Sequence, residues 1–247
     1  RVFISHLHGD HVLGLPGFLM SLQLTGRASP LEVHGPPGIR GFITGVLEMV
    51  QAQVAFPLEI LEHDGDGVAA RAAGYTVEFR ALDHRVPCLG YALVEDATPG
   101  TLDVARARRL GVPDGQPMGR LKGGQPVTLA DGTVVRPSQV VAPARPGLRV
   151  AYCTDTRPCE AAVILASGAD LLIHEATFGS ERAEDAHAKG HSTARDAAEI
   201  AAGAGARRLA LTHISPRYSD PEPLLVEARE VFPSAVVAAD LLVLDVP

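Results

Sequence analysis

The sequence predicts an α/β protein in which helices cover a layered sheet core. Short apolar segments typical of β-strands alternate with segments whose apolar residues recur at helical spacing, and this alternation runs through both halves of the 247-residue chain. Hydrophobic residues make up 46% of the sequence, which is enough for one large globular domain or two small ones.

A β-branched and aromatic run at the start of the chain predicts a strand that ends in metal-binding side chains. Four such side chains follow it within six positions: His6, His8, Asp10 and His11. Alternate residues of an extended segment face the same way, so His6 and His8 can reach one ion together. Gly9 permits a sharp turn that directs Asp10 and His11 to a second position beside the first. Imidazole and carboxylate without thiolate suit zinc, with manganese or iron as alternatives.

The rest of the first half predicts helices alternating with strands. Leu15, Phe18, Leu19 and Leu22 lie on one face of a helix, and Pro16 is tolerated in its first turn. The other elements expected are a strand over 31–34, a helix opening at Pro36-Pro37, and strands over 58–61, 76–82 and 89–94.

The character of the chain changes between Thr98 and Pro146, where Pro and Gly recur and apolar periodicity fades. We expect a projecting, flexible arm inserted within residues 99–146. Residues 101–125 include five cationic and two acidic side chains, which gives a local charge of +3 in a chain of net charge −7. These cations are Arg106, Arg108, Arg109, Arg120 and Lys122. The local reversal of charge predicts a polyanion contact, with an ordinary solvated loop as the alternative.

The second half predicts a further series of strands and helices. The expected elements are strands over 149–154, 171–174 and 209–212, helices over 159–167, 194–202 and 222–231, and strands near 236–238 and 241–246. Thr193 and Asp196 form a capping box at the start of the Ala-rich helix.

Three more candidate ligands, His84, Asp155 and His213, each follow directly on an expected strand. Ligands at several strand ends can converge on one rim of a sheet. Together with the opening group they make seven ligands, enough for two ions bridged by an aspartate. Two divalent ions among five neutral histidines and two carboxylates leave a charge of about +2, which attracts an anionic phosphodiester. The other histidines are expected to be structural or incidental: His34, His63, His174 and His187.

Composition and cysteine spacing exclude several classes of protein. No apolar run approaches the ~20 residues needed to span a bilayer, and no leader is recognisable, so we expect a cytoplasmic protein without membrane contact. The net charge of −7 argues against nucleic-acid binding over the whole surface. Three cysteines without a C-x-x-C pair indicate neither a disulfide framework nor a thiolate zinc site.

Six segments spread along the whole chain resemble the ribonuclease Z family, which are tRNA 3′-processing endonucleases. They are His6 to Leu15, the His84 segment ending in Cys88-Leu89-Gly90-Tyr91, Asp155-Thr156-Arg157, His174-Glu175-Ala176-Thr177-Phe178, Gly190-His191-Ser192-Thr193 and Leu211-Thr212-His213-Ile214-Ser215.

The resemblance implies an αββα four-layer sandwich of the metallo-β-lactamase type with two zinc ions, and a homodimer in which the arm of one subunit clamps precursor tRNA. The implied ligands are His6, His8 and His84 for one ion and Asp10, His11 and His213 for the other, with Asp155 bridging. Asp10 is also implied as the base that orients the attacking water. Glu175 and His191 match a proton-relay pair that protonates the leaving 3′ oxygen. The implied reaction cuts precursor tRNA after the discriminator nucleotide.

Two departures from the family pattern carry expectations of their own. Gly115-Gln116 stands where the family usually has Gly-Pro, which concerns tRNA affinity rather than chemistry. Complete members have several strands before the H-x-H-x-D-H motif, and this chain begins with Arg1, so we expect a missing N-terminal segment.

Other functions remain open on the sequence alone. The same site in a small-molecule phosphodiesterase or arylsulfatase-like relative would not need the arm, and neither would a thioesterase or β-lactamase. A truncated, inactive chain that only binds RNA or a partner subunit is a further alternative, which the amount of bound zinc would distinguish.

Overall fold

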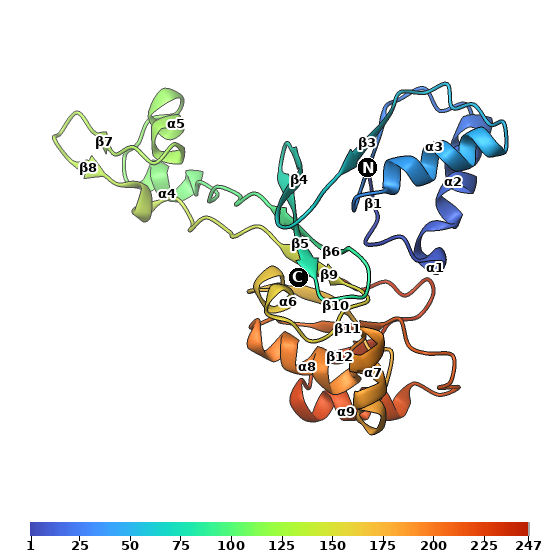
Figure 1. Ribbon diagram of the computed structural model, residues 1–247. Helices are drawn as coiled ribbons and strands as arrows, with labels where there is room; N and C mark the ends of the chain where they lie inside the picture. The colour runs from blue at the N-terminus through green and yellow to red at the C-terminus, as the bar shows by residue number, and fades with distance from the viewer. Residues whose placement is uncertain (247) are drawn as a thin grey trace. The chain divides into compact units, whose positions relative to one another are not determined.

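The computed structural model describes residues 1–246, which form two compact units (Figure 1). Unit 1 contains Arg1–Val94 and the part of the chain that begins at Leu148, and unit 2 contains Glu95–Gly147. Strands and helices alternate in unit 1, which confirms the α/β class. No helix in the described part of the chain is both long and apolar enough to cross a membrane.

The first sheet of unit 1 is parallel and has the order β1-β2-β3. Its strands are β1 (Val2–Phe3), β2 (Leu31–Gly35) and β3 (Leu58–Glu62). The helices associated with it are α1 (Gly9–Val12), α2 (Gly14–Leu24) and α3 (Ile39–Met49). Leu19, Ile39 and Ile43 are buried against Val33 in one cluster. Phe18, which the helical pattern placed on the packed face, is 46% exposed instead.

The second sheet has the order β12-β11-β10-β9-β6-β5-β4. Its strands are β4 (Gly67–Ala72), β5 (Tyr75–Leu82), β6 (Cys88–Glu95), β9 (Arg149–Cys153), β10 (Leu171–Glu175), β11 (Leu209–Thr212) and β12 (Ala235–Val237). Strands β9 to β12 are parallel, whereas β6 and β9 pair in antiparallel fashion. The parallel strands therefore present their carboxyl ends at one edge of the sheet.

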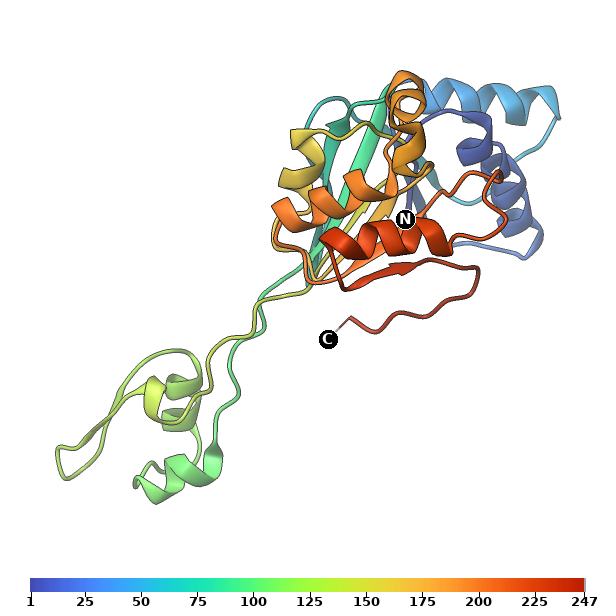
Figure 2. The same cartoon turned by 90° about the horizontal axis from the view of Figure 1, so that it is seen from below.

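Three helices pack on this sheet: α6 (Glu160–Leu165), α8 (Ala194–Gly203) and α9 (Glu222–Val231) (Figure 2). Helix α8 buries a face of small residues, including Ala194, Ala197 and Ala201, which lets its backbone lie close to the strands. Thr193 and Asp196 form the expected capping box at its start. Helix α7 (Ala183–Lys189), preceded by the short helix η2 (Ser180–Arg182), was not predicted.

The two sheets face each other across an aromatic contact. The rings of Phe3 and Tyr91 lie 5.3 Å apart, and the Tyr91 hydroxyl donates a hydrogen bond to the Ile4 carbonyl at 2.9 Å. Phe79 and Leu89 are buried in the same cluster. The layers are therefore helices, sheet, sheet and helices, which confirms the predicted αββα sandwich.

Unit 2 contains the segment predicted as an arm and has a small core of its own. Its elements are α4 (Val104–Arg109), α5 (Gln116–Lys122), the hairpin of β7 (Val127–Thr128) and β8 (Val134–Val135), and the short helix η1 (Pro137–Gln139). Ala107, Leu121 and Val135 are buried in this core. The sequence predicted no helices here, because elements of six or seven residues are too short to show a period.

One further expectation about the elements was wrong, and one strand was not predicted. The expected strand over 241–246 is not formed, because a turn from Ala239 to Leu242 interrupts the chain after β12 and leaves Leu241 99% exposed with a φ of +64°. Strand β4, in contrast, was not expected and pairs with β5 as the outer strand of the second sheet.

Candidate metal centre

The structure brings all seven predicted ligand residues together, and five of them lie just beyond the ends of strands. His6 and His8 follow β1, His84 follows β5, and Asp155 and His213 follow β9 and β11. Asp10 and His11 lie on the single helical turn α1 rather than on the expected sharp turn. Ligand atoms of these residues lie within 4.8 Å of one another in separate groups, two of which use the opening motif.

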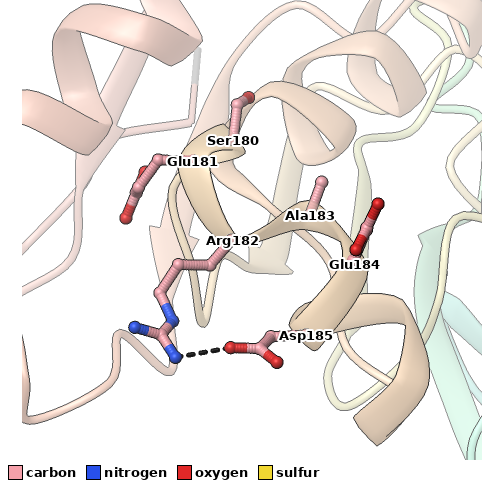
Figure 3. Close-up of a pocket in the computed structure, with 6 residues that line it drawn as sticks. All are labelled: Ser180, Glu181, Arg182, Ala183, Glu184 and Asp185. Atoms are coloured by element: carbon pink, nitrogen blue, oxygen red, sulfur yellow. Dashed lines mark hydrogen bonds and ion pairs between the residues drawn. The ribbon is translucent and has the colours of Figure 1, made fainter.

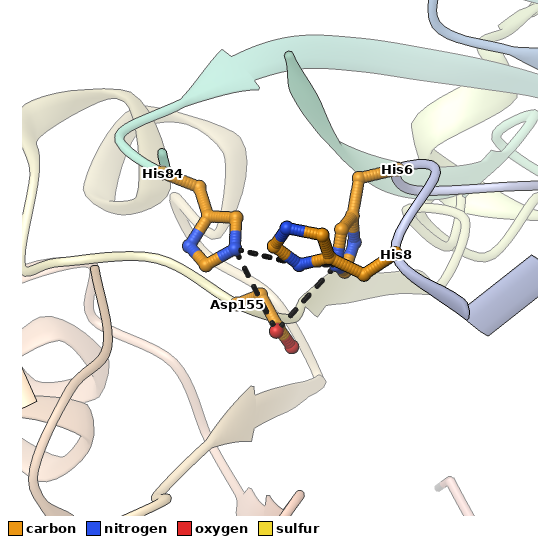
Figure 4. A group of neighbouring side chains, drawn as sticks. All are labelled: His6, His8, His84 and Asp155. Carbon is orange, nitrogen blue, oxygen red and sulfur yellow. Dashed lines mark hydrogen bonds and ion pairs between the residues drawn. The ribbon is translucent and has the colours of Figure 1, made fainter. Parts of the chain in front are cut away.

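The first group contains His6, His8, His84 and Asp155 (Figure 4). His8 Nδ1 lies 3.1 Å from His6 Nε2 and 3.3 Å from His84 Nε2. Asp155 Oδ2 lies 3.6 Å from His6 Nε2 and 3.9 Å from His84 Nε2. Ligand atoms bound tetrahedrally at about 2.0–2.1 Å would be about 3.3 Å apart. The group is therefore spaced to hold a divalent ion.

The second group contains Asp10, His11 and His213. Asp10 Oδ2 lies 3.4 Å from His11 Nε2 and 3.8 Å from His213 Nε2. The other oxygen of the central carboxylate, Asp155 Oδ1, lies 3.5 Å from His11 Nε2 and 3.4 Å from His213 Nε2. His11 Nε2 is buried and makes no hydrogen bond to any described residue, as expected of an atom reserved for a metal. Asp155 thus offers one oxygen to each group.

The environment favours the protonation states that metal binding requires. Burial lowers the pKa of His6 to about 3 and also lowers the pKa of His84. Burial alone would raise the pKa of Asp155, but His213 and a hydrogen bond from the Thr154 hydroxyl lower it below its ordinary value. At neutral pH His6 and His84 are thus neutral imidazoles and Asp155 is an ionised carboxylate, the forms that bind a metal.

Hydrogen bonds behind the ligands hold their rings in place. His84 Nδ1 donates to the Gly190 carbonyl at 2.7 Å, which leaves Nε2 free. His213 Nδ1 lies 2.9 Å from the Thr177 hydroxyl, whose own hydrogen is donated to Glu175 Oε2 at 2.6 Å. His213 must therefore be the donor to Thr177, and its Nε2 is likewise free for a metal.

Glu175 is fully buried and accepts hydrogen bonds from several donors beside the site. The backbone amides of Thr156 and Thr177 donate to its two oxygens at 2.8 and 3.1 Å. His191 Nδ1 lies 2.9 Å from Glu175 Oε1 and 3.9 Å from Asp155 Oδ2. Burial lowers the pKa of His191, but the hydrogen bond and the negative charge of Glu175 outweigh it and raise the pKa above the ordinary value. His191 can therefore hold a proton next to the ligands.

Two of the candidate ligands adopt a backbone conformation that is rare for residues with a side chain. Asp155 has a φ of +26° and His213 a φ of +56°. Such conformations cost about 1–3 kcal/mol each and persist where the surrounding structure holds them. The sequence does not signal this strain, because a positive φ is recognisable chiefly where a glycine occupies the position, and neither residue is a glycine.

Thr177 and Gly190 support the site but were not singled out from the sequence. A Cβ at Gly190 would lie 2.8 Å from His84 Nδ1, and the φ of +83° also favours glycine. Both residues lie inside motifs quoted for the resemblance, yet their individual roles depend on tertiary neighbours that no local pattern reveals.

The predicted RNA-binding residues lie on the two helices of unit 2. Arg106, Arg108 and Arg109 belong to α4, and Arg120 and Lys122 belong to α5. Arg108 pairs with Asp114 through two hydrogen bonds of 2.9 and 3.0 Å between exposed side chains.

The histidines expected to be structural or incidental make contacts within the fold. His34 Nδ1 lies 2.9 Å from His63 Nε2, and its Nε2 lies 3.3 Å from Glu32. His174 donates to the carbonyl of Glu175 at 2.7 Å, and His187 lies 2.9 Å from Asp196.

A separate hollow of about 570 Å³ lies over residues 180–185 and is unsuited to a polyanion (Figure 3). Glu181, Glu184 and Asp185 line it together with Arg182, whose guanidinium is paired with Asp185. Because acidic side chains dominate, the local charge would repel phosphate.

Known proteins resemble this chain in sequence along most of its length. A family model described as a beta-lactamase superfamily domain matches residues 115–214. The chain is 48% identical to ribonuclease Z of Salinibacter ruber, over 97% of this chain and 76% of the relative. It is also 48% identical to ribonuclease Z of Haloferax volcanii, over 100% of this chain and 78% of the relative.

Solved structures resemble it in fold. The short form of human tRNase Z matches with a TM-score of 0.66 and 25% identity, over 99% of this chain and 78% of that protein. The metallo-β-lactamase fold protein YhfI of Bacillus subtilis matches with a TM-score of 0.61 and 20% identity, over 96% of this chain and 73% of that protein. With relatives of this similarity and a fold and site of this geometry, the chain belongs to the ribonuclease Z family of endoribonucleases, within the metallo-β-lactamase superfamily.

Proposed function

We propose that the chain binds two zinc ions and hydrolyses precursor tRNA after the discriminator nucleotide. The products are a tRNA with a 3′-hydroxyl and a trailer with a 5′-phosphate. The observation that carries the proposal is the position of Asp155, which directs one oxygen to each of two ligand groups. Imidazole and carboxylate donors suit zinc. The neighbouring Cys88 sulfur contacts Nδ1 of His6, so it lies on the side of the ring away from the Nε2 that faces Asp155.

Three residues near the candidate metal positions have separate roles in the proposed reaction. Divalent ions bound here would lower the pKa of a water molecule and neutralise charge on the phosphodiester. Asp10, whose side chain is 69% exposed, accepts a hydrogen bond from the attacking water and orients it. Glu175 holds His191 protonated, and His191 gives its proton to the leaving 3′ oxygen.

Unit 2 supplies the proposed contact with the body of the tRNA. The cations that would bind its phosphates, in a contact that depends on salt, are Arg106, Arg108, Arg109, Arg120 and Lys122. Self-association of the chain to a homodimer is part of the proposal. Sedimentation of the purified chain measures whether a homodimer forms.

The direct test is incubation with a precursor tRNA that carries a 3′ trailer, with the cut position mapped. We expect one cut after the discriminator nucleotide, abolished by a chelator and restored by zinc. A cut elsewhere, or cleavage that a chelator leaves intact, contradicts the proposal.

A deletion within unit 2 separates tRNA processing from small-substrate hydrolysis. Leu102 and Val141 are paired in antiparallel fashion, so residues 103–140 can be replaced by a two-glycine turn without stretching the chain. This variant should lose precursor-tRNA cleavage and keep hydrolysis of bis(p-nitrophenyl) phosphate, which is a single phosphodiester. Retention of full activity on precursor tRNA would refute the role of unit 2.

A further inference from the structure

Three cations beside His191 differ from the other cations of unit 1 in having no hydrogen-bond acceptor among the described residues. They are Arg85, Lys189 and Arg217. Most other arginines of the unit pair with carboxylates: Arg1, Arg80, Arg149, Arg157, Arg182, Arg195 and Arg207. Four others donate to backbone carbonyls: Arg27, Arg40, Arg208 and Arg229. Arg71 donates to the Thr76 hydroxyl.

Arg85 lies against the residue that precedes His191. Its Cγ is 3.2 Å from the position that a Cβ of Gly190 would occupy, and its positive charge acts on His191. Arg85 is exposed and also lines a cavity of about 280 Å³ together with His63 and His84. Its stem is thus fixed by packing, whereas its guanidinium faces space beside a predicted metal ligand.

Lys189 and Arg217 both lie over the aromatic ring of Phe178, which is a second neighbour of His191. Lys189 Nζ is 5.5 Å and Arg217 Cζ 5.6 Å from the centroid of the Phe178 ring, which is 3% exposed. That ring lies 6.2 Å from the ring of His191. The cation–π contacts position both charges without neutralising them.

We propose that Arg85, Lys189 and Arg217 form a phosphate clamp that binds the backbone phosphates flanking the cleaved phosphodiester. In a chain of net charge −7, three cations without acceptors that each lie against a neighbour of His191 are most simply explained by an anionic ligand. Divalent ions held at the candidate metal centre would contact the cleaved phosphate itself, so the flanking phosphates of a single-stranded RNA end remain for these residues. The clamp rests on the proposed function, because it presumes an RNA substrate.

The test compares two substrates that differ in their flanking phosphates. Precursor tRNA has them and bis(p-nitrophenyl) phosphate does not. We expect Arg85→Ala, Lys189→Ala and Arg217→Ala each to lower kcat/KM for precursor tRNA about 10- to 100-fold, mainly through KM, as for loss of a charged hydrogen bond. Hydrolysis of bis(p-nitrophenyl) phosphate should stay within twofold of the wild type. The slope of log affinity against log salt should fall by about 0.7 for each cation removed.

Matched variants distinguish charge from packing. Arg85→Met keeps the stem against Gly190 and should be as defective as Arg85→Ala, whereas Arg85→Lys should recover most of the activity. Arg71→Ala removes an exposed arginine of the same unit whose side chain donates a hydrogen bond to the Thr76 hydroxyl at 3.4 Å, and should change neither activity. A neutral methylphosphonate at the phosphate that a cation binds should abolish the effect of mutating that cation.

Two results would overturn the clamp. One is a parallel loss on both substrates, which would mean that these residues only support the site. The other is unchanged cleavage of precursor tRNA by all three alanine variants. If the wild type itself fails to cleave precursor tRNA, the proposed function falls, and the clamp is judged on affinity for a single-stranded oligonucleotide. The same three variants must then bind it less tightly than the wild type.

Discussion

Replacing Thr177 with valine should weaken one metal position and leave the other almost intact. The Thr177 hydroxyl accepts a hydrogen bond from His213 Nδ1 at 2.9 Å and donates one to Glu175 Oε2 at 2.6 Å. Valine has nearly the same shape but makes neither bond. His213 would lose the contact that orients its ring, and Glu175 would lose one of its donors.

The size of the effect follows from these two bonds. A hydrogen bond to a charged group contributes about 1.5–3 kcal/mol and a neutral one about 0.5–1.5 kcal/mol, so the free energy of unfolding should fall by about 2–4.5 kcal/mol. Loss of an outer hydrogen bond typically weakens metal binding about 10- to 100-fold. This loss should fall on the position formed by Asp10, His11 and His213. The position formed by His6, His8 and His84 should change by less than about threefold.

Zinc titration against a chelating indicator resolves the two affinities. Thr177→Ser keeps the hydroxyl and should restore the weaker position. Thr44→Val removes an exposed threonine hydroxyl that bonds a helix carbonyl, and serves as the control for the substitution itself. Equal weakening of both positions, or no change in either, would refute the role assigned to Thr177.

Three further predictions concern the surroundings of the metal centre. His191→Gln should retain bound metal but lower kcat about 10²- to 10⁴-fold, whereas His187→Gln should not; loss of metal with kcat would contradict a proton-donor role. Gly190→Ala should reduce both stability and activity because its Cβ would lie 2.8 Å from His84 Nδ1. Gly205 has a φ of +63° and open space around it, so Gly205→Ala is a control for backbone strain alone. Equal losses of activity in the two variants would contradict the role of the His84 contact. Burial lowers the pKa of His34, so the unfolded state binds a proton first and stability should fall as pH drops below about 6.5, by up to about 1.4 kcal/mol per unit. Urea unfolding with chelator at pH 7.5 and 5.5 should show a smaller decrease for His34→Gln than for the wild type, and an equal decrease would be evidence against this assignment.

The candidate ligands could be predicted because each follows a recognisable strand. His84, Asp155 and His213 stand directly after apolar runs, and the structure places those runs in one sheet with their ends at the same rim. Their pairing with the opening motif required in addition that the two sheets face each other, because that motif follows β1 of the first sheet. The αββα architecture, in contrast, was expected from the resemblance rather than from the pattern.

The features that escaped prediction depend on tertiary contacts or on short elements. Thr177 acts through a histidine 36 positions away, and Gly190 acts through His84, which lies 106 positions away. Helices α4 and α5 are too short to show a period. The segment 241–246 has the composition of a strand, but a turn at its start leaves it unpaired within the described residues.

Anomalous diffraction at the zinc edge, from crystals of the zinc-loaded chain, tests the central claim most directly. We predict two peaks, one bound by His6, His8 and His84 and the other by Asp10, His11 and His213, each also bound by a different oxygen of Asp155. A single peak, or two peaks of which either lies out of reach of Asp155, would contradict the account.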